Sequence, residues 1–195
     1  MSTAADTRAI TPDEFYRLGD AARGYELVDG ELRELHMSAQ SSWVGGQIHF
    51  RFESYSRSYT PGWAFPPETG YRCFKDDPGL VRKPDASWIS IGRMTREEYE
   101  EEGFIEVVPD LVAEVISPND SAEEVEEKIE MWLAAGVKLL WEVYPNTRTI
   151  RAHRPDGTIT LIRAADTLTA PDVLPGLSLP VAELFRVPGE PAPAA

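Results

Sequence analysis

Two acidic residues in this chain lie in or beside short apolar runs that are typical of buried strands. Asp85 comes directly before residues 86–89, and Glu114 interrupts the apolar run of residues 111–116. A buried charge without a partner costs several kcal/mol or more. A hard divalent cation is one partner that carboxylates take, and two carboxylates that converge on one cation form a hydrolytic metal centre. We therefore expect Asp85 and Glu114 to lie close together.

Lys128 is the third residue that could take part in this chemistry. Ser121 and Glu124 have capping-box spacing and Gly136 provides a stop, which predicts a helix over residues 122–135. Lys128 lies on the flank of the apolar stripe of this helix, which is formed by Val125, Ile129, Trp132 and Leu133. Packed back on the sheet, this lysine could orient a water or stabilise charge on a phosphate. Alternatively, it offsets neighbouring glutamates from the edge of the core.

The carboxylates also have structural explanations. Asp85 follows a proline, where aspartate often bonds nearby backbone amides. Glu114 would simply face water if its strand were at an edge, although a buried glutamate is rarely without a role. Glu26 alternates with Tyr25 and Leu27 in a strand before the hairpin turn Asp29-Gly30, a pattern that favours an exposed residue.

The length of 195 residues predicts one domain with a full core. No apolar run is long enough to span a membrane and no signal peptide is recognisable, so we expect a cytoplasmic protein. The single cysteine, Cys73, excludes an intramolecular disulfide and disfavours a cysteine-based zinc site, and the three histidines have no metal-ligand spacing. We expect the three histidines, His36, His49 and His153, to be structural or surface residues.

The net charge of −14 disfavours a general nucleic-acid coat protein, but the charge is concentrated in one region. Between Glu97 and Glu130 there are 14 acidic residues and one basic residue, Lys128, so the rest of the chain is nearly neutral. Arg72, Lys75, Arg82 and Lys83 precede Asp85 and could face a phosphate, or they are ordinary surface charges.

Other local patterns predict the elements around these residues. A capping box at Thr11 and Glu14 predicts a helix that stops near Gly19, and a second one at Thr95 and Glu98 opens a short acidic helix. Further helical periodicity runs from about Trp43 to Tyr59. Strands are predicted at residues 69–74, 86–91, 111–116, 137–144, 148–154 and 158–163. Helices alternate with strands and hairpins, so we expect an α/β fold with a mixed central sheet flanked by helices.

Five segments together resemble one family in order and spacing. They are residues 26–32, 82–85, 109–120, Lys128 with Gly136-Val137, and the closing segment 174–185. The family is the Uma-type "putative restriction endonuclease" family of the PD-(D/E)XK nuclease superfamily, and the resemblance covers about residues 11–185. No single motif is specific, but the ordered set is.

The resemblance implies a restriction-endonuclease-like core with a mixed sheet of four or five strands and a site for Mg²⁺ or Mn²⁺. It maps the two acidic residues of the superfamily to Asp85 and Glu114, which we expect to hold the metal ion together with the Val115 carbonyl. We expect Lys128 to position the attacking water or to stabilise charge on the phosphate, and Glu26 to add a carboxylate at the rim. The superfamily lysine usually stands two residues after the second acid, where this chain has Ile116, so Lys128 resembles the variants with a migrated lysine. A histidine common after the position of Met37 is missing here, because Trp43-Val44-Gly45-Gly46 occupies that region.

The sequence therefore predicts a metal-dependent endonuclease that hydrolyses phosphodiester bonds in DNA and pairs as a homodimer. Two alternatives remain: an inactive nuclease fold used for binding or assembly, and a metal phosphoesterase with a substrate other than DNA. We expect a flexible segment over residues 1–10, one nuclease-like domain over residues 11–187, and a loose tail rich in Pro and Ala over residues 188–195.

Overall fold

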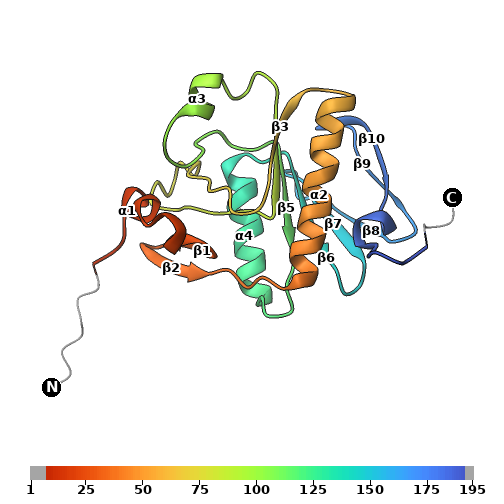
Figure 1. The fold of residues 1–195 in the computed structure, drawn as a ribbon, viewed down its shortest axis with the longest axis horizontal. Coiled ribbons are helices and arrows are strands. Elements are labelled where there is room, and N and C mark those ends of the chain that lie inside the picture. Colours follow the sequence, from red (N-terminus) through yellow and green to blue (C-terminus); the bar gives the residue numbers. More distant parts are fainter. Residues whose placement is uncertain (1–7, 192–195) are drawn as a thin grey trace.

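A six-stranded mixed sheet forms the centre of the computed structural model, which describes residues 8–191 (Figure 1). Its strands lie in the order β3-β4-β5-β6-β7-β8. Only β5 and β6 run parallel, and every other neighbouring pair is antiparallel. The strands are β3 (Gly62–Phe65), β4 (Ala86–Ser90), β5 (Leu111–Val115), β6 (Leu139–Tyr144), β7 (Thr149–His153) and β8 (Ile159–Arg163). The parallel pair requires a crossover, which the helix between its strands supplies.

Two long helices, α2 (Ala39–Ser58) and α4 (Ala122–Ala135), cover the two faces of this sheet, and β5 lies between them in Figure 1. Each begins with a capping box, formed by Ser38 with Ser41 and by Ser121 with Glu124. At the end of α4, Gly136 adopts φ 107°, a left-handed conformation that glycine takes without strain. The short helices are α1 (Pro12–Arg17), the 3₁₀ helix η1 (Gly19–Ala22), α3 (Arg96–Glu100) and α5 (Ala182–Phe185).

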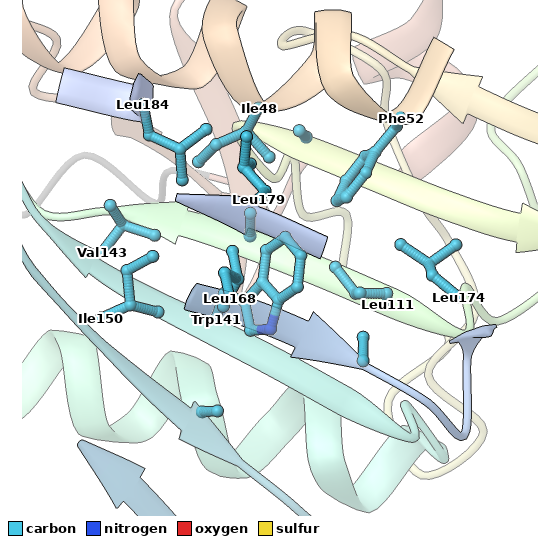
Figure 2. Packing of buried hydrophobic residues seen from close by; sticks show 14 of the residues in the cluster. Ile48, Phe52, Leu111, Trp141, Val143, Ile150, Leu168, Leu174, Leu179 and Leu184 are labelled. Carbon is cyan, nitrogen blue, oxygen red and sulfur yellow. The ribbon is translucent and has the colours of Figure 1, made fainter. Parts of the chain in front are cut away.

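Alternation along the strands divides the core into two layers. In β5, Leu111, Ala113 and Val115 face α2, whereas Val112 packs on the α4 side. Figure 2 shows the α2 layer, where Ile48 and Phe52 meet Trp141 and the aliphatic side chains of β5, β6 and β7. Glu114 therefore points to the α4 side, because successive strand residues face opposite ways.

Two small hairpins flank the sheet. β1 (Tyr25–Val28) pairs with β2 (Glu31–Glu34) through the predicted turn, in which Asp29 and Gly30 have φ values of 53° and 74°. β1 also bridges Val81 through two backbone hydrogen bonds of Leu27, which fixes the hairpin beside the chain that leads to β4. β9 (Thr167–Ala170) and β10 (Leu174–Pro180) form the second hairpin, whose apolar residues complete the α2 layer.

The structure corrects three of the sequence expectations. The segment 69–74 is not a strand, and only Tyr71 forms isolated bridges, to Arg82 and Ile105. The strand β3 lies instead between Pro61 and Pro66, where the prolines predicted a loop; prolines are tolerated at the ends of an edge strand. The sheet has six strands, whereas the family resemblance implies four or five, and the hairpin of β9 and β10 is additional.

Residues 1–7 of the predicted flexible N-terminus and residues 192–195 of the predicted tail lie outside the described part. Ile10 donates its backbone N–H to Gly30 at 2.8 Å and packs on the small core around Phe15, so the described end of the N-terminal segment contacts the hairpin. None of the helices within residues 8–191 is long and apolar enough to cross a membrane.

Candidate active site

A pocket of about 130 Å³ brings together Glu26, Asp85, Glu114 and Lys128. They come from four segments: β1, the residue before β4, β5 and α4. β4 and β5 are neighbours in the sheet, which places Asp85 beside the end of β5. The crossover then returns α4 over the same face as Glu114, so Lys128, two turns into the helix, reaches the carboxylates as the sequence predicts.

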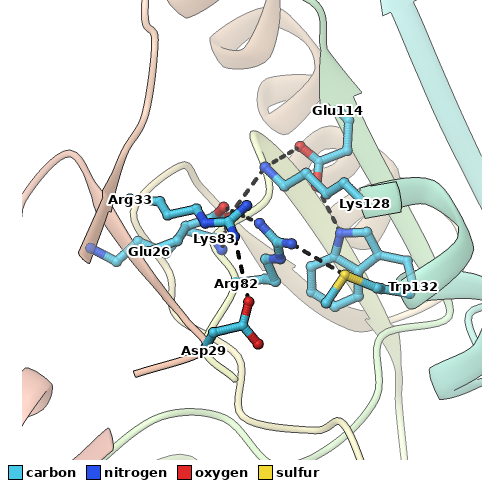
Figure 3. A network of polar contacts seen from close by, with 9 residues as sticks. Glu26, Asp29, Arg33, Arg82, Lys83, Glu114, Lys128 and Trp132 are labelled. Atoms are coloured by element: carbon cyan, nitrogen blue, oxygen red, sulfur yellow. Dashed lines mark hydrogen bonds and ion pairs between the residues drawn. The ribbon is translucent and has the colours of Figure 1, made fainter. Parts of the chain in front are cut away.

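Lys128 connects two of these carboxylates (Figure 3). Its Nζ atom lies 3.1 Å from Glu114 Oε2 and 3.2 Å from Glu26 Oε1. Only 18% of the lysine side chain is exposed. Burial alone would lower the pKa of Lys128, but the charges of Glu114 and Glu26 outweigh it and raise the pKa above its usual value. The lysine is therefore a fixed positive charge in the pocket rather than a proton acceptor.

Glu26 is buried beneath the pocket and not at its rim, which corrects both the predicted exposed strand residue and the predicted rim carboxylate. Its Oε2 accepts a hydrogen bond from Arg82 Nη1 at 3.0 Å, and its Oε1 accepts one from the Lys83 backbone N–H at 2.6 Å (Figure 3). Burial alone would raise the pKa of Glu26, but Lys128, Arg82 and the Lys83 amide hold it below its usual value. Glu26 is thus a permanent anion that anchors Lys128.

Glu114 is held from two sides. Its Oε1 accepts a hydrogen bond from the indole Nε1 of Trp132 at 2.7 Å, and its Oε2 pairs with Lys128 (Figure 3). Burial raises the pKa of Glu114 above its usual value, and the charge of Glu26 adds to this, although Lys128 opposes both. Because Lys128 and Trp132 both come from α4, this helix supplies both contacts.

Asp85 lies at the end of the strand pair with one oxygen fixed. The backbone N–H of Val115 donates to Asp85 Oδ2 at 2.7 Å. The other oxygen, Oδ1, faces α2 at Gly45, where a β-carbon would lie 3.7 Å away. Burial and the nearby charge of Glu114 raise the pKa of Asp85 to about 7. The pair of Asp85 and Glu114 therefore carries more negative charge than its protein surroundings compensate.

This excess negative charge fits a hard divalent cation. Asp85 and Glu114 offer carboxylate oxygens, and Val115, whose carbonyl is the expected third ligand, also lines the pocket. Within residues 8–191 there is no cluster of three or more His, Cys, Asp or Glu side chains arranged to hold a metal. The third carboxylate of the pocket, Glu26, pairs with Lys128 and Arg82. Mg²⁺ is commonly held by one or two carboxylates and completed by water and substrate oxygens, so the donor set is sufficient.

The basic residues before Asp85 do not give the pocket a phosphate-facing surface, because Arg82 and Lys83 are buried and the other two, Arg72 and Lys75, do not line it. Arg72 pairs with Asp13 and Glu106, at 3.5 and 3.9 Å. Lys83 is buried, where its Nζ lies 2.8 Å from Glu68 and donates to the Ala22 carbonyl at 3.0 Å. Arg82 forms a buried ion pair with Glu26. The outer wall of the pocket is acidic instead, with one exposed arginine, Arg33, among Glu34, Glu68, Asp120, Glu124 and Glu127.

Three participants were not assigned to the site from the sequence: Trp132, Arg82 as the partner of Glu26, and Gly45. Trp132 follows Lys128 by one helical turn, so the same face of α4 had to carry both, and this spacing was a usable signal. Arg82 and Gly45 had none, because their partners Glu26 and Asp85 are 56 and 40 positions away in the chain. Cys73 is buried with its pKa raised to about 12, as expected of an inert thiol.

Comparison with known proteins links this chain to one protein family and to solved structures of the same fold. A family profile described as "Uma2: Putative restriction endonuclease" matches residues 12–182. Among solved structures, the fold is similar to that of a putative nuclease of DUF820 from Anabaena variabilis ATCC 29413, with a TM-score of 0.71 and 23% identity, covering 90% of this chain and 97% of that one. Curated proteins gave no match. The architecture is thus restriction-endonuclease-like.

Proposed function

Because the chain belongs to the Uma2 family of putative restriction endonucleases, we propose that it is a Mg²⁺- or Mn²⁺-dependent endonuclease that hydrolyses phosphodiester bonds in DNA. The observation that carries this proposal is the position of Lys128. The charged Lys128 lies 3.1 Å from Glu114 in the pocket that also holds Asp85. With two carboxylates, Asp85 and Glu114, beside one lysine, this part of the pocket has a net negative charge that suits a cation. A purely structural ion pair would not need the additional buried carboxylate of Asp85.

The residues take the following roles. Asp85, Glu114 and the Val115 carbonyl would hold the metal ion, which would supply Lewis-acid activation of the scissile phosphate and of the attacking water. Lys128 stabilises the negative charge that grows on the phosphate during attack. Glu26 neutralises part of the charge of Lys128 and holds its ammonium group toward the pocket. Glu26 itself needs no contact with the substrate.

Cleavage of supercoiled plasmid DNA decides between this function and its alternatives. We expect nicked or linear product with Mg²⁺ or Mn²⁺ and none in EDTA. A protein that binds metal but cleaves neither plasmid nor single-stranded oligonucleotide would support an inactive binding module. Hydrolysis of a small phosphodiester without cleavage of DNA would support the second alternative, a metal phosphoesterase with a substrate other than DNA. The acidic outer wall makes this comparison necessary, since it repels a DNA backbone.

Metal binding should be visible as thermal stabilisation. A ligand at 100 times its dissociation constant stabilises the native state by about 2.7 kcal/mol, which raises the Tm of a chain of this size by about 5–10 °C. We expect this rise with Mn²⁺ in the wild type and none in Asp85→Asn. Asp110→Asn is the matched control: Asp110 is also buried, at the opposite end of β5, and pairs with Lys138 and Arg93 at 2.7 and 2.8 Å. This control should keep the rise. An equal rise in wild type and Asp85→Asn would remove the proposed site.

We also propose that the protein is a homodimer, since two active sites that face the two strands of a duplex would allow both strands to be cut at one place. The edge strand β8 supports this proposal, because it exposes Ile159 and Leu161 on the outer end of the sheet. Light scattering at micromolar concentration should give twice the 21.7 kDa mass of the chain. A monomer mass up to about 100 µM would contradict the proposal.

A further inference from the structure

Trp132 contacts the candidate metal ligand Glu114 directly. Its Nε1–H donates to Glu114 Oε1 at 2.7 Å, a short bond to a charged acceptor inside the protein. The other oxygen of the same carboxylate, Oε2, pairs with Lys128. The two oxygens therefore have different partners, and rotation of the carboxylate about its terminal torsion would break both contacts. Such a terminal torsion is otherwise broad and weakly restrained.

The indole ring is itself held in place. Trp132 is completely buried, and its ring packs edge-on against Tyr71 and tilted against Phe74, with centroid separations of 5.7 and 5.0 Å. Tyr71 is fixed in turn by a 2.6 Å hydrogen bond between its hydroxyl and Ser87 Oγ. Ser87 belongs to β4, the strand that follows Asp85. The ring thus joins the elements that carry the two acidic residues.

Packing alone does not explain this hydrogen bond. Three other tryptophans, Trp63, Trp88 and Trp141, have buried indole N–H groups that find no hydrogen-bond partner within residues 8–191. This protein therefore uses buried tryptophan elsewhere for volume alone. At position 132 the donor is directed at a carboxylate, which distinguishes Trp132 from these three residues.

We propose that Trp132 is a positioning residue for the metal site: its indole N–H fixes the rotation of the Glu114 carboxylate, and with it the direction of the carboxylate oxygens in the pocket. This inference rests on the proposed function, in which Glu114 is a ligand. Residues that orient ligands in this way change metal affinity or activity by about 10- to 100-fold when they are replaced. Trp132 does not touch the substrate in this role.

The test is direct titration of Mn²⁺, by electron paramagnetic resonance or calorimetry, on wild type, Trp132→Phe and Trp141→Phe. Both variants remove the same atoms from a buried tryptophan, but only Trp132→Phe removes a hydrogen bond to a carboxylate. Trp141 lies on β6, facing α2, and is 2% exposed. We expect Trp141→Phe to bind Mn²⁺ like the wild type and Trp132→Phe to bind it about 10- to 100-fold more weakly.

Equal Mn²⁺ affinities for the two variants would overturn the positioning role. If Trp132→Phe does not fold, 3-benzothienylalanine at position 132 keeps the ring shape without an N–H donor, and the same loss of affinity is then expected of it. Unchanged affinity with this analogue would also overturn the role. Failure of the wild type to bind Mn²⁺ would instead refute the proposed metal site itself, so the two failures are distinguishable.

Discussion

Replacing Lys128 by Met should lower the rate of phosphodiester cleavage by about 10²- to 10³-fold, the usual cost of losing one preorganised stabiliser of transition-state charge. The ammonium group lies 3.1 Å from Glu114 Oε2, and its positive charge is secured by Glu114 and Glu26. Metal binding should survive, because the proposed oxygen ligands remain and a competing cation has been removed. The rate is measured at saturating Mn²⁺, so that the bound ion supplies positive charge beside Asp85 and Glu114 in place of the missing lysine.

Lys138→Met is the control for this experiment. Lys138 also pairs with a buried carboxylate, Asp110 Oδ1 at 2.7 Å, but at the other end of β5 and outside the pocket. Its replacement should lower stability and leave the cleavage rate unchanged. Wild-type cleavage by Lys128→Met would show that the migrated-lysine assignment is wrong. A Lys128→Met protein that is unfolded even with Mn²⁺ would show that this lysine is structural and would favour the inactive module.

Asp85→Asn should reduce cleavage to the level of the metal-free protein and yet stabilise that metal-free protein. The first effect follows from the loss of a ligand charge. The second follows from the pKa of Asp85, which burial and Glu114 raise to about 7. Asparagine can still accept the hydrogen bond from the Val115 N–H, so the substitution removes mainly the uncompensated charge. In EDTA at pH 8 we expect a Tm higher by a few °C, since about 1 kcal/mol shifts Tm by about 2–4 °C in a chain of this size.

The pH dependence of this stabilisation has a definite sign. A carboxyl group whose pKa is raised in the native state binds more protons when folded than when unfolded, so the wild type loses stability as pH rises from about 4 to about 7. The advantage of Asp85→Asn in EDTA should therefore grow over this range and stay constant above it. Thermal or urea unfolding at pH 5, 6, 7 and 8 measures it.

Asp110→Asn should behave in the opposite way. Burial alone would raise the pKa of Asp110, but hydrogen bonds from Lys138 and the Ser90 amide and the charge of Arg93 hold it below its usual value. The ionised form is therefore stabilising at neutral pH, and its replacement should lower Tm there, by less as the pH falls below 4. If both substitutions, Asp85→Asn and Asp110→Asn, lower the Tm in EDTA at pH 8, then Asp85 is an ordinary structural carboxylate and its charge does not destabilise the metal-free protein.

Local patterns in the sequence determined most of the elements that carry the site. Ser121, Glu124 and Gly136 define the ends of α4, and the structure confirms all three. The turn Asp29-Gly30 defines the hairpin that carries Glu26. These signals are legible because capping and tight turns depend on residues a few positions apart. The same reasoning failed at residues 69–74 and at β3, where the β conformation depends on a neighbour that is distant in sequence.

The tertiary structure decided what each charged residue does. From the sequence, Glu26 was an exposed or rim carboxylate, and Arg82 and Lys83 were candidate phosphate contacts. In the fold, β1 packs against the chain that leads to β4, so Glu26 is buried with Arg82 and Lys128 as its counter-ions. Similarly, the sequence identified Trp132 only as part of an apolar stripe, whereas in the structure its indole N–H donates to Glu114. The sequence determines which residues can be charged and which must be buried, whereas only the packing of distant segments decides which charges neutralise one another, because a Coulomb interaction depends on distance in space and on burial.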